Sequence, residues 1–186
     1  MVSLVRVTVF CGSRTGNCSE YFDAAIELGK CLSERNIDLV YGGGGTGLMG
    51  SLADSVLEHG GTAIGVIPDS LKEKEKAHRH LSKLYVVDSM HNRKLMMGNL
   101  SQAFIVLPGG LGTMEEFFEV ATWTQLGILQ KPYGFLNIAG YYEKLFTWLK
   151  EMEYQGFLEK NYVSALIVDN QPDSLLDKLH EQIHKK

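Results

Sequence analysis

The sequence predicts an α/β fold in which a mostly parallel sheet of about seven strands carries helices on both faces. Two observations lead to it. Short apolar runs rich in β-branched residues alternate with segments of helical pattern along nearly the whole chain, which is the sequence form of parallel strands joined by right-handed crossovers. Several runs also end directly in glycine-rich turns, as expected at the carboxyl edge of such a sheet. We therefore expect a Rossmann-like, doubly wound domain.

The apolar runs place the individual elements. The expected strands cover residues 5–10, 39–41, 63–67, 84–87, 103–107, 133–136 and 165–168. The run at 103–107 (AFIVL) has the length and composition of a buried parallel strand. Residues 174–184 follow the last strand and predict an amphipathic helix that packs on the core. The charged segment 69–83, between the third and fourth strands, favours a solvated helix.

Length and composition limit the classes of function. A chain of 186 residues with 45% hydrophobic content fits one domain over residues 1–186. The net charge of −4 and the absence of a Lys/Arg block argue against nucleic acid or a membrane surface as partner. No stretch approaches the roughly 20 apolar residues of a membrane span, and the first residues lack the pattern of a signal peptide. We expect a cytoplasmic protein with a small-molecule ligand.

The cysteines carry no recognisable chemistry. Cys11, Cys18 and Cys31 are an odd number at spacings that fit neither a zinc site nor a redox CxxC motif. We expect three reduced thiols and no metal site.

Three glycine-rich turns mark the expected ligand crevice. They lie at residues 11–16 (CGSRTG), 42–50 (GGGGTGLMG) and 108–113 (PGGLGT), each after a strand. In doubly wound sheets, ligands bind at the carboxyl ends of the strands where the winding direction reverses, so all three turns should open onto one crevice. Ser13, Gly44 and Gly45 are candidate phosphate or crevice contacts. Glycine is also common in ordinary strand-to-helix turns, so one such turn alone would be weak support.

The PGGLGT turn has the properties of an anion cradle. Gly109, Gly110 and Gly112 allow a tight turn and a close approach of the backbone to a ligand, and the helix that follows presents its first N–H groups to an anion. The spacing differs from an ATP-binding Walker loop, which needs Lys followed by Ser or Thr after its last glycine. This turn therefore indicates phosphate binding without phosphoryl transfer.

A dinucleotide site is an alternative reading of the second turn. Gly45, Gly47 and Gly50 satisfy GxGxxG after a strand, and Asp69 lies about 20 residues further on. The motif follows the second strand rather than the first, however, and faces another glycine turn. We favour one mononucleotide held between the turns, and titration with a nicotinamide cofactor would distinguish the two.

An arginine points toward the core of the expected crevice. On a helix, Arg93 shares a face with Met96, Met97 and Leu100, which aims its guanidinium inward. A buried arginine needs a carboxylate or phosphate partner, although its stem alone can lie on the core while the head reaches solvent. Lys94 points about 100° away and belongs to the surface or to the crevice rim.

The acids after PGGLGT have two readings. Thr113 and Glu116 form T-x-x-E, the pattern of a capping box, and acids such as Glu115 are favoured near a helix N-terminus. The functional reading rests on placement, because a phosphate held by the preceding glycines leaves the rest of its molecule near Glu116. An acid and an arginine beside a sugar phosphate suggest cleavage of a ribosyl bond through an oxocarbenium-like state.

The combination GGGxxGLMG, SMHxRK and PGGxGTxxE, with the later segment KPYGFLNIAGYYEKL, resembles the LONELY GUY (LOG) family of cytokinin riboside 5′-monophosphate phosphoribohydrolases, often labelled lysine decarboxylases. The resemblance implies a Rossmann-like homodimer without metal or redox cofactor. It also implies hydrolysis of an adenine-type nucleoside 5′-monophosphate, either AMP or a cytokinin ribotide, to free base and ribose 5-phosphate. A non-catalytic nucleotide or cofactor carrier is the alternative.

The same resemblance assigns residues. It implies that Arg93 and Glu116 are the catalytic pair. The residues expected to bind substrate are Glu75, Lys94, Gly109, Gly110, Leu111, Gly112, Thr113, Met114, Glu115 and Thr122. The sequence departs from the plant pattern at Arg14, Leu111 and Ala139, which bears on the choice of base.

Overall fold

The computed structural model describes residues 4–73 and 76–184. Within these residues, seven strands form one parallel sheet in the order β4-β3-β2-β1-β5-β6-β7. The strands are β1 (Arg6–Phe10), β2 (Asp38–Tyr41), β3 (Ala63–Pro68), β4 (Lys83–Val87), β5 (Ala103–Val106), β6 (Tyr133–Leu136) and β7 (Ile167–Asp169). The α-helices are α1 (Ser19–Glu34), α2 (Gly47–Glu58), α3 (Met90–Leu100), α4 (Leu111–Gln125), α5 (Glu143–Tyr154) and α6 (Pro172–His184). The doubly wound α/β fold predicted from the sequence is confirmed.

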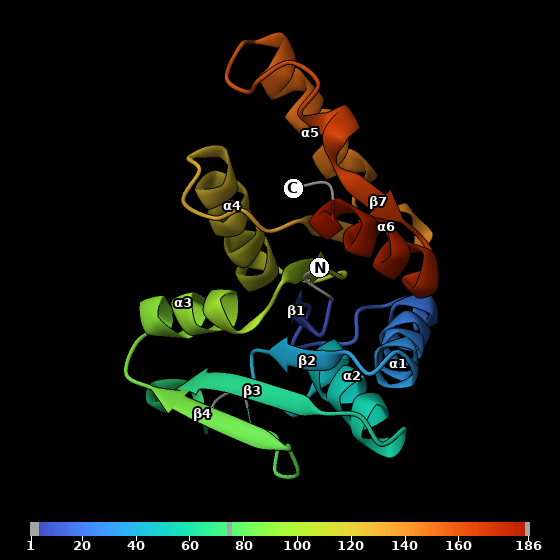
Figure 1. Cartoon of the computed structure of the whole chain (residues 1–186), viewed down its shortest axis with the longest axis vertical. Coiled ribbons are helices and arrows are strands. Elements are labelled where there is room, and N and C mark those ends of the chain that lie inside the picture. The colour runs from blue at the N-terminus through green and yellow to red at the C-terminus, as the bar shows by residue number, and fades with distance from the viewer. Residues whose placement is uncertain (1–3, 74–75, 185–186) are drawn as a thin grey trace.

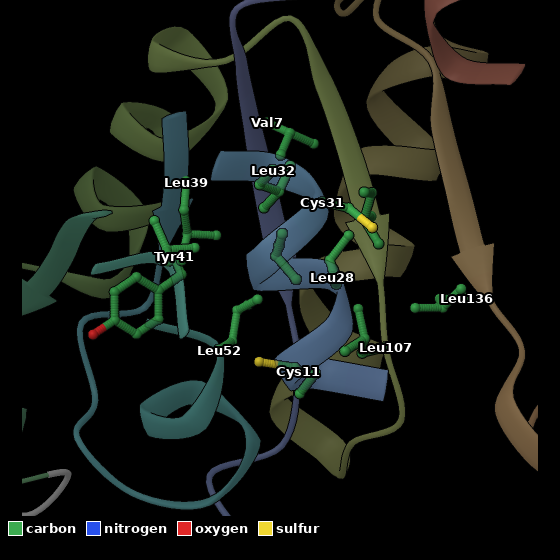
Figure 2. Packing of buried hydrophobic residues seen from close by; sticks show 14 of the residues in the cluster. Val7, Cys11, Leu28, Cys31, Leu32, Leu39, Tyr41, Leu52, Leu107 and Leu136 are labelled. Atoms are coloured by element: carbon green, nitrogen blue, oxygen red, sulfur yellow. The ribbon is translucent and has the colours of Figure 1, made fainter. Parts of the chain in front are cut away.

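Helices cover both faces of the sheet (Figure 1). Helices α1, α2 and α6 supply one hydrophobic cluster and α3, α4 and α5 the other. Successive side chains of β1 point to opposite faces of the sheet, so Val7 and Val9 belong to the first cluster and Phe10 to the second. In Figure 2, Leu28 of α1 and Leu52 of α2 lie among the buried side chains of the sheet. Such two-sided burial explains why the strands read as continuous apolar runs.

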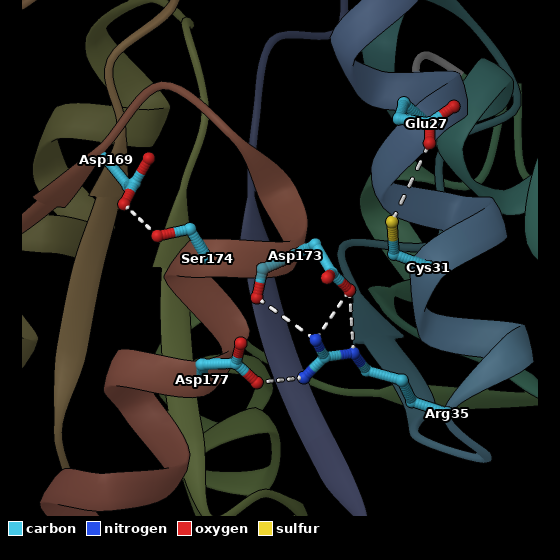
Figure 3. A network of polar contacts seen from close by, with 7 residues as sticks. All are labelled: Glu27, Cys31, Arg35, Asp169, Asp173, Ser174 and Asp177. Atoms are coloured by element: carbon cyan, nitrogen blue, oxygen red, sulfur yellow. Dashed lines mark hydrogen bonds and ion pairs between the residues drawn. The ribbon is translucent and has the colours of Figure 1, made fainter.

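A group of ion pairs joins two neighbouring helices of the first face, α1 and α6. Arg35, at the end of α1, donates to the carboxylates of Asp173 at 2.9 Å and Asp177 at 2.7 Å on α6 (Figure 3). Beside it, Asp169 at the end of β7 accepts a hydrogen bond of 2.5 Å from Ser174. These contacts tie the C-terminal helix to the sheet edge and to α1.

Two expectations for single elements need correction. The seventh strand begins at Ile167, because Val163–Ala165 forms a short 3-10 helix. The expected helix over 69–83 is wrong: after a 3-10 helix at Asp69–Leu71, the described residues as far as Ser82 form no helix, and Lys83 already begins β4. The backbone of this segment instead bonds to the second glycine turn, where Gly45 N–H donates to Lys76 at 2.9 Å and His78 N–H donates to Gly43 at 2.9 Å. The expected substrate contact Glu75 lies outside the described residues.

The strand order fixes where a ligand site should lie. β1 pairs with β2 on one side and β5 on the other, and the chain winds outward in both directions from this pair. The switch point is therefore beyond the carboxyl ends of β1 and β5, where the turns 11–16 and 108–113 are found. Among the described residues, no helix combines the length and apolarity that crossing a bilayer requires.

Candidate active site

The three glycine turns are bonded to one another at the switch point. Gly12 N–H donates to Pro108 at 3.0 Å, which joins the first turn to the third. Met49 N–H, at the start of α2, donates to Gly12 at 3.2 Å, and the Thr46 hydroxyl donates to Ser13 at 3.2 Å. The turns thus form one connected main-chain surface.

The third turn leads straight into a helix. Gly110 is the N-cap of α4 with an extended backbone and no side-chain hydrogen bond to the helix. The first amides of α4 have no acceptor within the helix, and the helix dipole adds positive potential there. The loop is tight, because a Cβ at Gly109 would overlap the Thr113 side chain. This is the geometry of an anion site built from backbone alone.

The capping-box reading of Glu116 is not supported. A capping box requires Thr113 at the N-cap, but α4 begins at Leu111, which places Thr113 at its third residue and Glu116 at its sixth. Glycine rather than threonine ends the loop, so the T-x-x-E pattern occurs inside the helix. Glu116 instead lines the cavity described below.

Arg93 is buried and held by the main chain. Its side chain is 5% exposed, and the helical spacing had aimed it inward. Its Nε donates to the carbonyl of Val66 at 3.1 Å, and Nη2 donates to the carbonyl of Gly42 at 3.2 Å. These carbonyls lie in β3 and directly after β2. Two neighbouring strands therefore hold the guanidinium, and the reading in which it reaches solvent is wrong.

Arg93 and Glu116 form a buried ion pair in the site. Arg93 Nη2 lies 3.9 Å from Glu116 Oε1, and the Glu116 side chain is 11% exposed. Cys11, at the end of β1, is the next neighbour. Its burial, with the added effect of the Glu116 charge, raises the pKa of the Cys11 thiol well above its ordinary value, so the thiol stays protonated. The three cysteines are free thiols in the structure, as expected.

A cavity of about 650 Å³ opens over this pair. Its walls come from the first turn, the third turn and the residues around the Arg93–Glu116 pair. The lining residues are Cys11, Gly12, Ser13, Arg14, Thr15, Gly16, Tyr21, Leu48, Met49, Met90, Arg93, Pro108, Gly109, Gly110, Leu111, Gly112, Thr113, Glu115, Glu116 and Tyr141. The volume suits a small organic ligand.

Lys94, an expected substrate contact, does not line this cavity. It forms ion pairs with Glu115 and, at 3.0 Å, with Glu119, which join α3 to α4 beside the catalytic candidates. Desolvation opposes its charge, but the hydrogen bonds that it donates to the two carboxylates raise the pKa of Lys94 above its ordinary value. Lys94 is therefore a permanent cation that holds the two helices together.

Other candidates lie elsewhere. Gly44 pairs with Ala77 in an isolated bridge, and Gly45 borders a second cavity under the segment 76–80. Met114 packs into the core cluster of α3, α4 and α5. Thr122 is exposed further along α4 and donates to Phe118 at 2.7 Å. None of these four lines the first cavity.

The GxGxxG glycines are explained by close packing. A Cβ at Gly47 would overlap the backbone of Ser13 and Arg14, and one at Gly50 would lie 2.7 Å from the Gly45 carbonyl oxygen. Gly47 also has φ of 62°, which disfavours any side chain. Gly47 allows the first two turns to touch and Gly50 allows the second turn to close on itself, so these glycines need no dinucleotide to account for them.

Two tyrosines of the cavity were not predicted from the pattern of glycines and charges. Tyr21, in the first turns of α1, and Tyr141, after β6, line the cavity and meet edge to face with ring centroids 5.5 Å apart. The GYY segment was a motif that pointed to Tyr141, whereas nothing around Tyr21 distinguished it from a packing residue.

The fold and the cavity define a Rossmann-like α/β protein with a crevice bordered by the N-terminus of α4 and a buried acid–arginine pair. A family described as "Possible lysine decarboxylase" matches residues 49–179. The cytokinin riboside 5'-monophosphate phosphoribohydrolase LOG2 of Arabidopsis thaliana is 44% identical over 97% of this chain and 84% of its own length. A probable enzyme of the same name from Oryza sativa subsp. japonica, LOGL2, is 47% identical over 95% of this chain and 72% of its own. The chain belongs to this LOG family, as its motifs predicted.

Solved structures share the fold at lower identity. A molybdenum cofactor carrier protein from Chlamydomonas reinhardtii matches with a TM-score of 0.70 at 18% identity, covering 97% of this chain and 98% of that one. The molybdenum cofactor binding protein of Rippkaea orientalis matches with a TM-score of 0.72 at 18% identity, covering 98% and 99%. At such identity the likeness establishes the arrangement of the sheet and helices.

Proposed function

We propose that the protein hydrolyses the N-glycosidic bond of adenine-type nucleoside 5′-monophosphates, AMP or a cytokinin ribotide, to free base and ribose 5-phosphate. The observation that carries this proposal is the Arg93–Glu116 pair, 3.9 Å apart, in a cavity whose wall is the N-terminus of α4. Membership of a family whose relatives are named phosphoribohydrolases supports the same reaction.

The α4 N-terminus is the proposed phosphate site. The amides of Leu111, Gly112 and Thr113 begin the helix and supply donors and a favourable dipole to a dianion. A phosphate anchored there leaves the ribose to extend into the cavity. Glu116 lies five residues after Leu111, about 7.5 Å along the axis of α4 from its start. The loop therefore sets the distance between the phosphate and the carboxylate.

Glu116 is the proposed catalytic carboxylate. As the bond from C1′ of the ribose to the base nitrogen breaks, positive charge develops on the sugar, and a carboxylate in a poorly hydrated site stabilises it strongly. Water then adds to C1′ and loses one proton to the carboxylate, while the departing base gains one proton. The bond electrons leave with the base, and the products are free base and ribose 5-phosphate.

Arg93 is the proposed partner of both Glu116 and the nucleotide. Its carbonyl contacts fix the guanidinium plane, and they place its positive charge 3.9 Å from the carboxylate that we assign to the reaction.

The family's descriptive name implies a different reaction that the cavity does not fit. A lysine decarboxylase would use pyridoxal phosphate bound as a Schiff base to a lysine. Within the described part of the chain, no lysine lines the cavity, and the nearby Lys94 is committed to ion pairs with Glu115 and Glu119. We derive no step through that cofactor. A carrier function is likewise not favoured, because the carriers resemble this chain at 18% identity and the hydrolases at 44%.

A substrate panel tests the proposal. AMP, other nucleoside monophosphates, isopentenyladenosine monophosphate and the unphosphorylated nucleosides are incubated with the protein, and free base is measured by chromatography. We expect release from adenine-type monophosphates and almost none from the nucleosides. Glu116→Gln and Arg93→Ala should remain folded and lose about 10²-fold or more in kcat. Glu119→Gln, on the same helix, is the matched control and should stay active. Release that survives Glu116→Gln at the normal rate would refute the mechanism.

We further propose a cytoplasmic homodimer. The three free thiols suit a reducing compartment. The exposed side chains of Val86 on β4 and Leu95 on α3 border a groove of about 670 Å³, which is a suitable surface for a second copy. Light scattering of the purified protein should give twice the chain mass, and Leu95→Glu should reduce it to that of one chain.

A further inference from the structure

We propose that Gly42 is a positioning residue for the reaction, because the absence of its side chain is what admits the Arg93 guanidinium. The catalytic part of this inference rests on the function proposed above, whereas its steric part stands on geometry alone. Gly42 directly follows β2, and Arg93 lies on α3, 51 residues further along the chain.

The space at Gly42 is occupied by the guanidinium. A Cβ on Gly42 would overlap Arg93 Nη2 and would lie 3.2 Å from both Arg93 Cζ and Met49 Sδ. At the same time, the Gly42 carbonyl accepts the hydrogen bond from Nη2 at 3.2 Å. The residue therefore supplies both the acceptor and the room needed to approach it.

Backbone conformation does not explain this glycine. Gly43, the next residue, has φ of 77° and needs glycine for its left-handed conformation. Gly42 is not among the described glycines with positive φ, so its backbone accepts an L-residue. What excludes a methyl group at position 42 is the Arg93 side chain and the neighbouring Met49.

Arg93 has no easy way to yield to a methyl group. Its Nε is fixed to the Val66 carbonyl at 3.1 Å, and the whole residue is 4% exposed. Moving the head would break the bond to Gly42 and change the 3.9 Å separation from Glu116. Loss of hydrogen bonds to a buried charge is costly, and a small displacement of a catalytic group greatly reduces rate.

A double-mutant cycle tests the inference. Gly42→Ala, Arg93→Ala and the double variant are compared with the wild type for kcat, KM and Tm, with AMP as substrate. We expect Gly42→Ala to lower kcat about tenfold or more with a smaller change in KM, and to lower Tm. In the Arg93→Ala background the remaining close atom is Met49 Sδ at 3.2 Å, in a flexible side chain that can shift, so Gly42→Ala should lower kcat and Tm much less than it does in the wild type.

The matched control is Gly98→Ala on α3, where the nearest atom to a Cβ is Phe104 Cζ at 4.0 Å; it should keep both activity and Tm. Wild-type kcat in Gly42→Ala would overturn the inference. An equal fall in Tm in both backgrounds would also overturn it, because the methyl group would then clash with something other than Arg93. If the wild type releases no base, the proposed function is refuted but the steric part of the inference is not. The Tm values of the four proteins then still decide whether Gly42 and Arg93 are coupled.

Discussion

The hydroxyl of Tyr141 donates a hydrogen bond of 2.5 Å to the carbonyl of Gly109, 32 residues earlier in the chain. A residue after β6 thereby holds the first glycine of the loop that precedes α4. The neighbouring Tyr142 makes a similar but buried contact: its hydroxyl donates to the Leu107 carbonyl at 2.5 Å. One exposed and one buried tyrosine therefore fix the same strand-to-helix turn.

Tyr141→Phe should weaken substrate binding with little loss of stability. Removing one hydrogen bond worth about 1 kcal/mol loosens the phosphate loop and should raise KM about fivefold. Tyr141 is 42% exposed, so the fold should tolerate the change. Steady-state kinetics and thermal melting check this. Tyr142→Phe is the contrasting variant, because its hydroxyl is buried, and it should lower Tm.

Gly112→Ala should separate ligand binding from folding. No described atom lies within 4 Å of a Cβ at this position, and alanine is a better helix former than glycine by about 1 kcal/mol. We expect Tm to be kept or raised and KM for a nucleotide to rise, because the methyl group projects where the phosphate should bind. An unchanged KM would place the phosphate elsewhere.

Gly47→Ala is the contrasting variant. Its φ is 62°, so the substitution should destabilise the protein.

Tyr41→Phe should stabilise the protein. The Tyr41 hydroxyl is buried and, among the described residues, is a side-chain group without a hydrogen-bond partner; Figure 2 shows the ring packed at the end of β2. Burial raises the pKa of Tyr41 far above its ordinary value, so the group stays neutral. Removing an unsatisfied polar atom should increase the free energy of unfolding by about 1 kcal/mol. Urea denaturation measures it, and a loss of stability would show that the hydroxyl is satisfied in solution.

Asp169 should contribute stability that is lost in acid. Burial opposes its ionisation, but hydrogen bonds from Lys178, Ser174 and the Gln171 amide lower the pKa of Asp169 from 3.8 to about 2. A lowered folded-state pKa stabilises the protein fully above about pH 4, and this stabilisation disappears as the pH falls toward 2.

Asp169→Asn should therefore cost about 1 kcal/mol at pH 7 and progressively less below pH 4. Denaturation series of both proteins between pH 2 and pH 7 provide the measurement. Parallel curves for wild type and variant across that range would contradict the prediction.

The sequence predicted those features that depend on local pattern. The hydrophobic runs predicted the boundaries of the strands with an error of at most two residues, which occurs at the start of β7. The helical spacing of Arg93 and Met97 predicted the direction of the Arg93 side chain. The carbonyls that receive the guanidinium were not predictable, because Gly42 and Val66 meet Arg93 only through the tertiary fold.

Two errors show where local pattern misleads. The T-x-x-E of Thr113 and Glu116 resembles a capping box, but the N-cap is Gly110, whose missing side chain leaves no signature. The charged segment 69–83 has the composition of a surface helix or a surface loop alike. Its backbone bonds to Gly43 and Gly45 decide the outcome, and those partners are distant in sequence.

The hydrogen bonds that hold Arg93 end on main-chain carbonyls, so they depend little on which side chains surround it. Every residue carries a carbonyl, so the acceptor at position 66 would survive replacement of Val66 by any residue that keeps β3 in register with its neighbours. Substitutions of core side chains that keep the strands in register should therefore leave the hydrogen bonds of the guanidinium unchanged. The orientation of this arginine is inherited with the register of the sheet, and a shift of one strand by one residue would harm it more than most substitutions of the side chains around it.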